Sequence, residues 1–132
     1  MQSAKNYKKF IIVLMFLFCS AGQAKEFNEK FYQSQWCNRW NGKQEVRLID
    51  LTRVDCVTKN YAVEFDFIKK WAECFGQATH YGDLTGKKPA CILIIEKPAD
   101  FIQYYKVMPT FKKHNVTLWY MKSPLFYQNL KR

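Results

Sequence analysis

The sequence has few residues that interrupt secondary structure and few that bind transition metals. Its 132 residues include 5 Gly, 4 Pro and 2 His. No Pro/Gly/Ser-rich stretch is long enough to be a linker and no internal repeat is present, which favours a single domain. No cysteines have the C-x-x-C or Cys/His spacing of structural zinc sites, which favours disulfides or buried thiols over zinc. The sequence therefore predicts one continuous core.

Acidic residues are also in short supply. The chain has 21 Lys and Arg against 11 Asp and Glu, a formal net charge of +10. Such a balance favours polyanionic partners, nucleic acid or an anionic membrane surface. The alternative is a basic surface that serves only solubility.

The N-terminal apolar run is too short to span a bilayer. It lies in residues 1–24, which have the three parts of a secretory signal: Lys5, Lys8 and Lys9, then "FIIVLMFLF", then "AGQA". We expect cleavage after Ala24, which leaves a single domain over residues 25–132, periplasmic or secreted and without stable membrane insertion. A lipoprotein site at Cys19 is the alternative, although the bulky Phe18 precedes it.

Four cysteines remain after removal of the signal: Cys37, Cys56, Cys74 and Cys91. This even number lies in a chain expected in a compartment that permits disulfides, so we expect disulfides or buried thiols. Four cysteines allow three pairings, and the sequence leaves the choice open. A Cys37–Cys56 bond is our first expectation, because it would fasten the first helix to the sheet.

Hydrophobic periodicity predicts an α/β fold with a mixed central sheet flanked by helices. The first helix covers residues 26–40, and "EVRLID" and "RVDCVT" form a hairpin that leads into "YAVEFDF". A helix over residues 68–84 follows, and then the apolar run "ACILIIE", typical of a buried parallel strand. A second crossover helix, "ADFIQYYKVMPTF" with a break near Pro109, precedes the strand "VTLWYM". The tail "KSPLFYQNLKR" is left unassigned.

Two carboxylates share one face of the third strand. Period-two geometry places Glu64 and Asp66 together with Ala62, and Asp55 on the preceding strand adds a third acid. Carboxylates on a central strand are costly to desolvate unless they are paired or bind a cation. Their oxygens are the ligands that Mg²⁺ or Mn²⁺ prefers. The alternative is a set of surface ion pairs with Lys59, Lys69 or Lys70.

The helix after this strand carries a polar stripe. At 100° per residue, Lys70, Gln77 and Tyr81 lie within about 40° of one another, with Cys74 beside them. The stripe borders an apolar face predicted to pack on the sheet, which comprises Ile68, Trp71, Ala72, Phe75 and Thr79. Lys70, in the first turn, is close to the end of the carboxylate strand.

These residues resemble the PD-(D/E)XK nuclease superfamily, especially its RecB-like branch. The likeness rests on Asp55 on the second strand, Glu64 on the third and Gln77-x-x-x-Tyr81 on the next helix, in an αβββαβ order. Residues 52–89 also resemble a group of small bacterial secreted proteins with this core. The resemblance implies a single-domain restriction-endonuclease-like core in which Asp55 and Glu64 bind metal, and Gln77 and Tyr81 orient the site or touch DNA.

The sequence departs from that family at one position. The family has a lysine two residues after the second acid, where this chain has Asp66. The resemblance implies that Lys70 takes over from the helix and that Asp66 is an extra ligand or a base. Glu29 on the first helix matches a further acid present in some members.

The function expected from these features is metal-dependent hydrolysis of nucleic acid by an exported enzyme. Nucleic acid is the expected partner and Mg²⁺ or Mn²⁺ the expected cofactor. Two alternatives are an inactive module that binds nucleic acid or another polyanion, and an interaction or effector protein. The residues expected to hold the phosphate backbone without reading sequence are Arg39, Lys43, Arg47 and Arg53.

Overall fold

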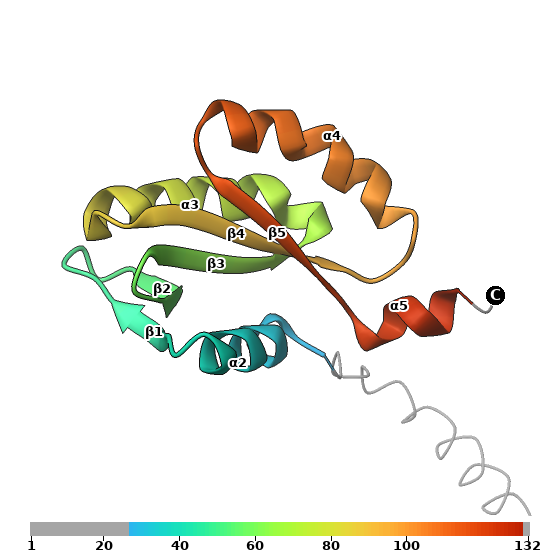
Figure 1. The fold of residues 1–132 in the computed structure, drawn as a ribbon, viewed down its shortest axis with the longest axis horizontal. Helices are drawn as coiled ribbons and strands as arrows, with labels where there is room; N and C mark the ends of the chain where they lie inside the picture. The colour runs from blue at the N-terminus through green and yellow to red at the C-terminus, as the bar shows by residue number, and fades with distance from the viewer. Residues whose placement is uncertain (1–26, 131–132) are drawn as a thin grey trace, which may run out of the picture.

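Strand β3 (Tyr61–Phe67) lies at the centre of the sheet, and the rest of the chain is arranged around it (Figure 1). The computed structural model describes residues 27–130. The remaining elements are α2 (Glu29–Arg39), β1 (Lys43–Arg47), β2 (Arg53–Val57), the 3₁₀ helix η1 (Ile68–Lys70), α3 (Trp71–Thr85), β4 (Lys88–Ile95), α4 (Asp100–Lys113), β5 (Thr117–Lys122) and α5 (Pro124–Asn129). The predicted signal segment and Cys19 lie outside the described residues.

The sheet is mixed, as predicted. Its five strands lie in the order β1-β2-β3-β4-β5. β1, β2 and β3 pair antiparallel, whereas β3, β4 and β5 pair parallel. From Ala90 to Ile95, β4 is buried at every position, the pattern of an interior parallel strand covered on both faces.

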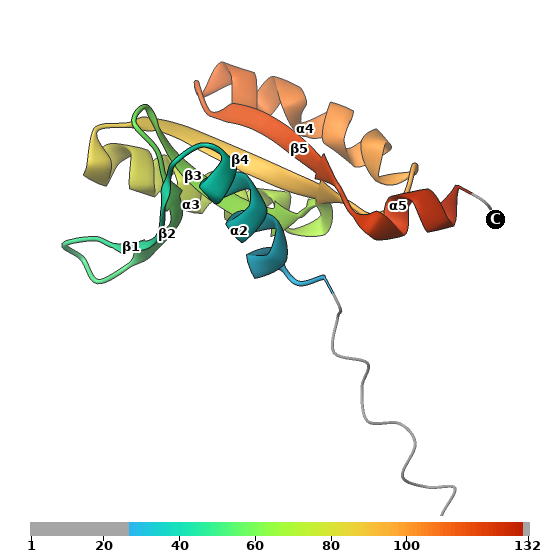
Figure 2. The ribbon, with the colours of Figure 1, turned by 60° about the horizontal axis from the view of Figure 1, so that its bottom comes forward.

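Helices cover both faces of the sheet (Figures 1 and 2). Alternate residues of β4 pack on opposite faces. Ala90, Ile92 and Ile94 pack in the core beneath α2, with Tyr32 and Cys37 of that helix. The alternate residues of β4, namely Cys91, Leu93 and Ile95, pack in the core beneath α3 and α4. The fold is therefore a three-layer α/β domain.

Each layer of helix is cross-linked to the sheet. The predicted Cys37–Cys56 disulfide is confirmed and joins α2 to β2, with Cα atoms 5.8 Å apart. A second disulfide, Cys74–Cys91, joins α3 to β4 on the other face, with a Cα separation of 6.0 Å. Two disulfides fit a chain that folds in an oxidising compartment.

The hairpin between β1 and β2 turns earlier than predicted. The expected strand over residues 45–50 ends at Arg47, because residues 48–52 form the turn. Leu48 N donates to Thr52 O and Leu51 N to Leu48 O, and Leu51 has a φ of 70°. Leu51 therefore adopts a left-handed conformation that its residue type did not signal.

The face that α3 presents to the sheet also differs from the prediction. Cys74, Ala78 and Tyr81 are buried, whereas Ala72 is exposed. The predicted polar stripe thus includes two residues of the buried face. Small side chains at Cys74 and Ala78 allow the helix to approach the sheet closely, which leaves the larger Phe75 to pack sideways on Phe111 of α4.

Two further differences concern the C-terminal third. Helix α4 continues through Pro109, where a break was predicted. Pro109 and Tyr105 are both exposed, so water can satisfy the carbonyl that proline leaves without a helical partner. The unassigned tail forms α5, whose N-cap Ser123 accepts a hydrogen bond from Leu125 N. None of the helices within residues 27–130 has the length and apolar character needed to cross a membrane.

Gly42 gives the first test of this packing. A Cβ at this position would lie 2.5 Å from Cys56 Sγ and 2.6 Å from Cys37 Sγ, whereas a Cβ at Gly76 meets nothing within 4 Å. We expect Gly42→Ala to lower the free energy of unfolding by about 1–3 kcal/mol, as overpacking does. Gly76→Ala, the matched control on an exposed helix position, should raise it by about 0.5–1 kcal/mol. Urea unfolding measures both, and equal effects would contradict the packing described.

Candidate functional site

The regular pairing of β2 with β3 stops beside Asp55. Only Cys56 with Val63 and Val57 with Ala62 are paired. Beyond them, Phe65 N donates to Asp55 Oδ2 at 2.9 Å, a side-chain oxygen instead of a strand carbonyl. The carboxyl group of Asp55 is thus inserted between the two strands, next to Glu64.

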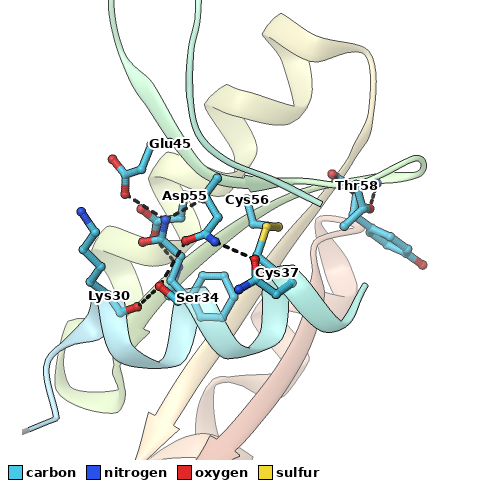
Figure 3. The surroundings of a disulfide bond; sticks show 12 residues. Lys30, Ser34, Cys37, Glu45, Asp55, Cys56 and Thr58 are labelled. Atoms are coloured by element: carbon cyan, nitrogen blue, oxygen red, sulfur yellow. Dashed lines mark hydrogen bonds between the residues drawn. A yellow bond between two sulfur atoms is a disulfide. The ribbon is translucent and has the colours of Figure 1, made fainter. Parts of the chain in front are cut away.

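Glu45 lies across from this irregularity, in a conformation that the sequence did not signal. Its φ is 54°, and the β1–β2 register is regular on both sides of it but leaves out Glu45 and Asp55. A left-handed backbone at a residue other than glycine costs about 1–3 kcal/mol and persists where neighbours hold it. Here Gln33 Nε2 donates to both Glu45 Oε1 and Asp55 O, each at 2.8 Å. Figure 3 shows Glu45 and Asp55 beside α2, near the Cys37–Cys56 disulfide.

Asp55 and Glu64 form a carboxyl pair, in which Glu64 is buried and Asp55 is half-buried. Glu64 is 7% exposed, and its carboxyl group hydrogen-bonds with that of Asp55. Burial and then the nearby Asp55 charge raise the pKa of Glu64 to about 9, and burial raises the pKa of Asp55 to about 6. Glu64 Oε2 is buried and has no hydrogen-bond partner. At neutral pH the pair holds a proton, and one of its oxygens is left without a partner.

Asp66 and Lys70 meet at the end of β3. Lys70 Nζ lies 3.7 Å from Asp66 Oδ1 and 3.6 Å from Glu29 Oε1. Burial and then the charge of Glu29 raise the pKa of Asp66 to about 7, while Asp66 and then Glu29 raise the pKa of Lys70. The structure therefore places Lys70 beside Asp66 and Glu29, and its ion pairs within residues 27–130 do not include Asp55 or Glu64.

The two residues of the Gln77-x-x-x-Tyr81 motif have different surroundings. Tyr81 is buried, and burial followed by the charges of Glu64 and Asp55 raises the pKa of its phenol. Its side chain also hydrogen-bonds with the backbone of Arg53. Gln77 is only half-buried, one turn earlier on α3, and its side chain makes no hydrogen bond within residues 27–130. Tyr81 thus belongs to the site, and no contact joins Gln77 to it.

The four residues predicted to contact phosphate are all exposed, but they lie in different places. Arg47 and Arg53 lie opposite each other on β1 and β2. Arg53 Nε lies 2.9 Å from Glu45 Oε2, which places Arg53 beside the acids. Arg39 ends α2, and Lys43 begins β1, on the far side of the turn that follows the helix.

The predicted metal ligands supply oxygen donors. Carboxylate oxygens are the ligand type that Mg²⁺ and Mn²⁺ prefer, and Asp55, Glu64 and Asp66 carry them. Within residues 27–130, however, no three carboxylate, histidine or cysteine side chains are already grouped as ligands. The carboxyl groups of Asp55 and Glu64 hydrogen-bond with each other, and Glu64 Oε2 has no partner. Binding of a divalent ion by these residues therefore stays a prediction.

Sequence reasoning missed Glu45 and Gln33, and it gave Glu29 only through the resemblance. Glu45 lies on an ordinary-looking strand, and only its positive φ turns it toward Gln33. Gln33 is 3% exposed on α2, a polar residue at a core position. Its place in the buried helical face is the one signal that could have indicated it.

No family model, curated protein or solved structure matches this chain. The likeness to PD-(D/E)XK nucleases therefore stays a prediction.

The raised carboxyl pKa values predict how stability depends on pH. Unfolded Asp and Glu titrate near 3.8 and 4.5, whereas folded Asp55, Asp66 and Glu64 titrate near 6, 7 and 9. The folded state thus binds more protons between about pH 4 and pH 9, so the free energy of unfolding falls as pH rises through that range. In chelator, we expect a lower Tm at pH 8.5 than at pH 5.5, by roughly 4–8 °C for each kcal/mol lost.

Glu64→Gln should flatten this decline and raise Tm at pH 8.5, because the amide carries no charge to bury. Asp83→Asn, at an exposed position of α3, should leave the decline unchanged. A decline that persists unaltered in Glu64→Gln would show that other groups cause it. Thermal unfolding followed by circular dichroism measures all three proteins.

Proposed function

We propose that this chain is an exported, metal-dependent nuclease that hydrolyses phosphodiester bonds of nucleic acid on a restriction-endonuclease-like core. The observation that carries the proposal is the Asp55–Glu64 carboxyl pair, with its raised pKa values and the unpartnered Glu64 Oε2. Burying such a pair costs stability, and a bound cation would offset that cost.

The order of elements supports the same proposal. α2, β1, β2, β3, α3 and β4 follow one another as αβββαβ, the order that the resemblance implied. Acids from the second and third strands meet, and Tyr81 arrives from the helix that follows. Two disulfides agree with a periplasmic or secreted location.

Asp55 and Glu64 would hold Mg²⁺ or Mn²⁺, with Asp66 as a further oxygen ligand. The bound ion would lower the pKa of a water molecule and neutralise charge on the phosphate. Lys70 is held at the edge of the acids by Asp66 and Glu29, and its side chain is 45% exposed. That position allows its ammonium group to reach a phosphate oxygen from solvent and stabilise the charge that develops there.

The first test is cleavage of labelled single- and double-stranded DNA and RNA. We expect hydrolysis with Mg²⁺ or Mn²⁺ and none with chelator. Glu64→Gln should reduce the rate at least about 100-fold, since losing even an indirect support of a metal site typically costs 10–100-fold. Asp83→Asn, the exposed control, should keep full activity.

Two results would count against the enzyme. Cleavage that survives Glu64→Gln would place the activity elsewhere or in a contaminant. Binding that weakens steeply with salt, without cleavage under any metal, would instead support the inactive binding module.

Lys70 gives an independent prediction. Lys70→Met should lower turnover by roughly 100-fold with little change in KM, as loss of one donor to a developing oxyanion does. Lys69→Met is the matched control, because Lys69 is the exposed neighbour on the same turn. Lys70→Arg should recover part of the rate. Equal rates for the two methionine variants would remove Lys70 from the mechanism.

A further inference from the structure

An open cavity lies between the C-terminal end of α2, the turn between β2 and β3, and strand β5. It has a volume of about 550 Å³, within the range of ligand-binding clefts. Its lining includes Trp36, Trp40, Lys59, Asn60, Tyr61 and Trp119, which we call the aromatic groove. Glu29, the acid that α2 brings to Lys70, lies at the other end of that helix.

The rings of the aromatic groove form a connected set. The ring centre of Trp36 lies 5.9 Å from that of Trp40 and 5.7 Å from that of Trp119. Tyr61 packs edge-on against Trp119, with ring centres 5.0 Å apart. Trp36 also contacts Phe65 of β3, which anchors the set to the core. The rings are therefore held in place from below.

Packing within the core does not account for all of these rings. Trp40 follows the last residue of α2 and is 59% exposed, although its indole could bury a large apolar area. Trp36, Tyr61 and Trp119 are half-buried. An exposed tryptophan beside other partly exposed rings is a surface on which a flat molecule can stack.

The charge around the aromatic groove has one sign. Lys59 lines it, and Lys87 Nζ donates to Lys59 O at 2.8 Å, which brings a second ammonium group to the same turn. Lys88 Nζ lies 5.9 Å from the ring centre of Tyr61. None of the described residues that line the groove is acidic. Stacked rings beside lysines suit a ligand that is flat and anionic, whereas a neutral sugar would use the rings and not the lysines.

We propose that the aromatic groove binds single-stranded nucleic acid, with bases stacked on Trp40 and its neighbours and phosphates held by Lys59 and Lys88. Bases are free to stack only where the strand is unpaired. The inference rests on the proposed function to the extent that it names the substrate, but binding can be measured without cleavage. Tyr61 and Asp66 lie about 16 Å apart along β3 at 3.3 Å per residue, so groove variants leave the acids in place.

The test is binding of fluorescein-labelled oligothymidylate of twenty bases, by anisotropy in chelator at low salt. We expect Trp40→Ala to weaken binding roughly 5- to 150-fold, the usual effect of losing one base-stacking ring. Trp40→Phe should recover most of the affinity, and Lys59→Gln should reduce the salt dependence. Tyr105→Ala removes a 63% exposed ring on α4, on the other face of the sheet, and should change nothing.

The outcomes separate this inference from the nuclease. Normal binding by Trp40→Ala would overturn it, as would equal affinity for the duplex, or binding of neutral oligosaccharides with no binding of the oligonucleotide. Asp83→Asn, at an exposed position of α3, should bind like the wild-type chain. If the wild-type chain binds but never cleaves, the groove stands and the nuclease fails. Thermal unfolding of each variant confirms that it is folded.

Discussion

The attachment of α2 to the β1–β2 hairpin is the constraint on which both surfaces of this protein depend. The Cys37–Cys56 disulfide fixes one turn of the helix, and Gln33, one turn earlier, donates to β1 and β2 together. With the helix fixed in this way, the ring of Trp36 is held against that of Trp119 on β5. Without the attachment Glu45 would lose the partner that holds its left-handed backbone, and the carboxyl pair would lose one wall.

The position of Glu64 and Asp66 in the sheet lowers the stability of the fold. Glu64 and Asp66 occupy a central strand where apolar side chains would pack without cost, as every neighbour on β4 from Ala90 to Ile95 does. Lys70 is too exposed to compensate the whole group. Burial and neighbouring like charges shift the pKa values of these carboxyl groups. Groups with strongly shifted pKa values cluster at functional sites.

The elements themselves could be read from the sequence, since alternation and apolar runs depend on local burial alone. β3 begins and ends where its pattern does, and Glu64 and Asp66 on it are buried. What failed depended on neighbours far along the chain. The buried face of α3 was misplaced because Phe75 packs on α4, and no local pattern marks the backbone of Glu45. Pro109 was read as a break because solvent on that side of α4 could not be foreseen.

The two disulfides close short loops, with separations of 19 and 17 residues, and both lie before Glu96. From Glu96 to Leu130, α4, β5 and α5 are joined to the rest by packing and hydrogen bonds alone. Local opening costs least where no covalent link limits it. Trp36 and Trp40 are therefore on a helix that a disulfide ties to the sheet, while Trp119 is on an edge strand held by its pairing with β4. One wall of the aromatic groove is thus covalently linked to the sheet, and the other depends on hydrogen bonds and packing, so reduction of the disulfides would act on the first wall and not on the second.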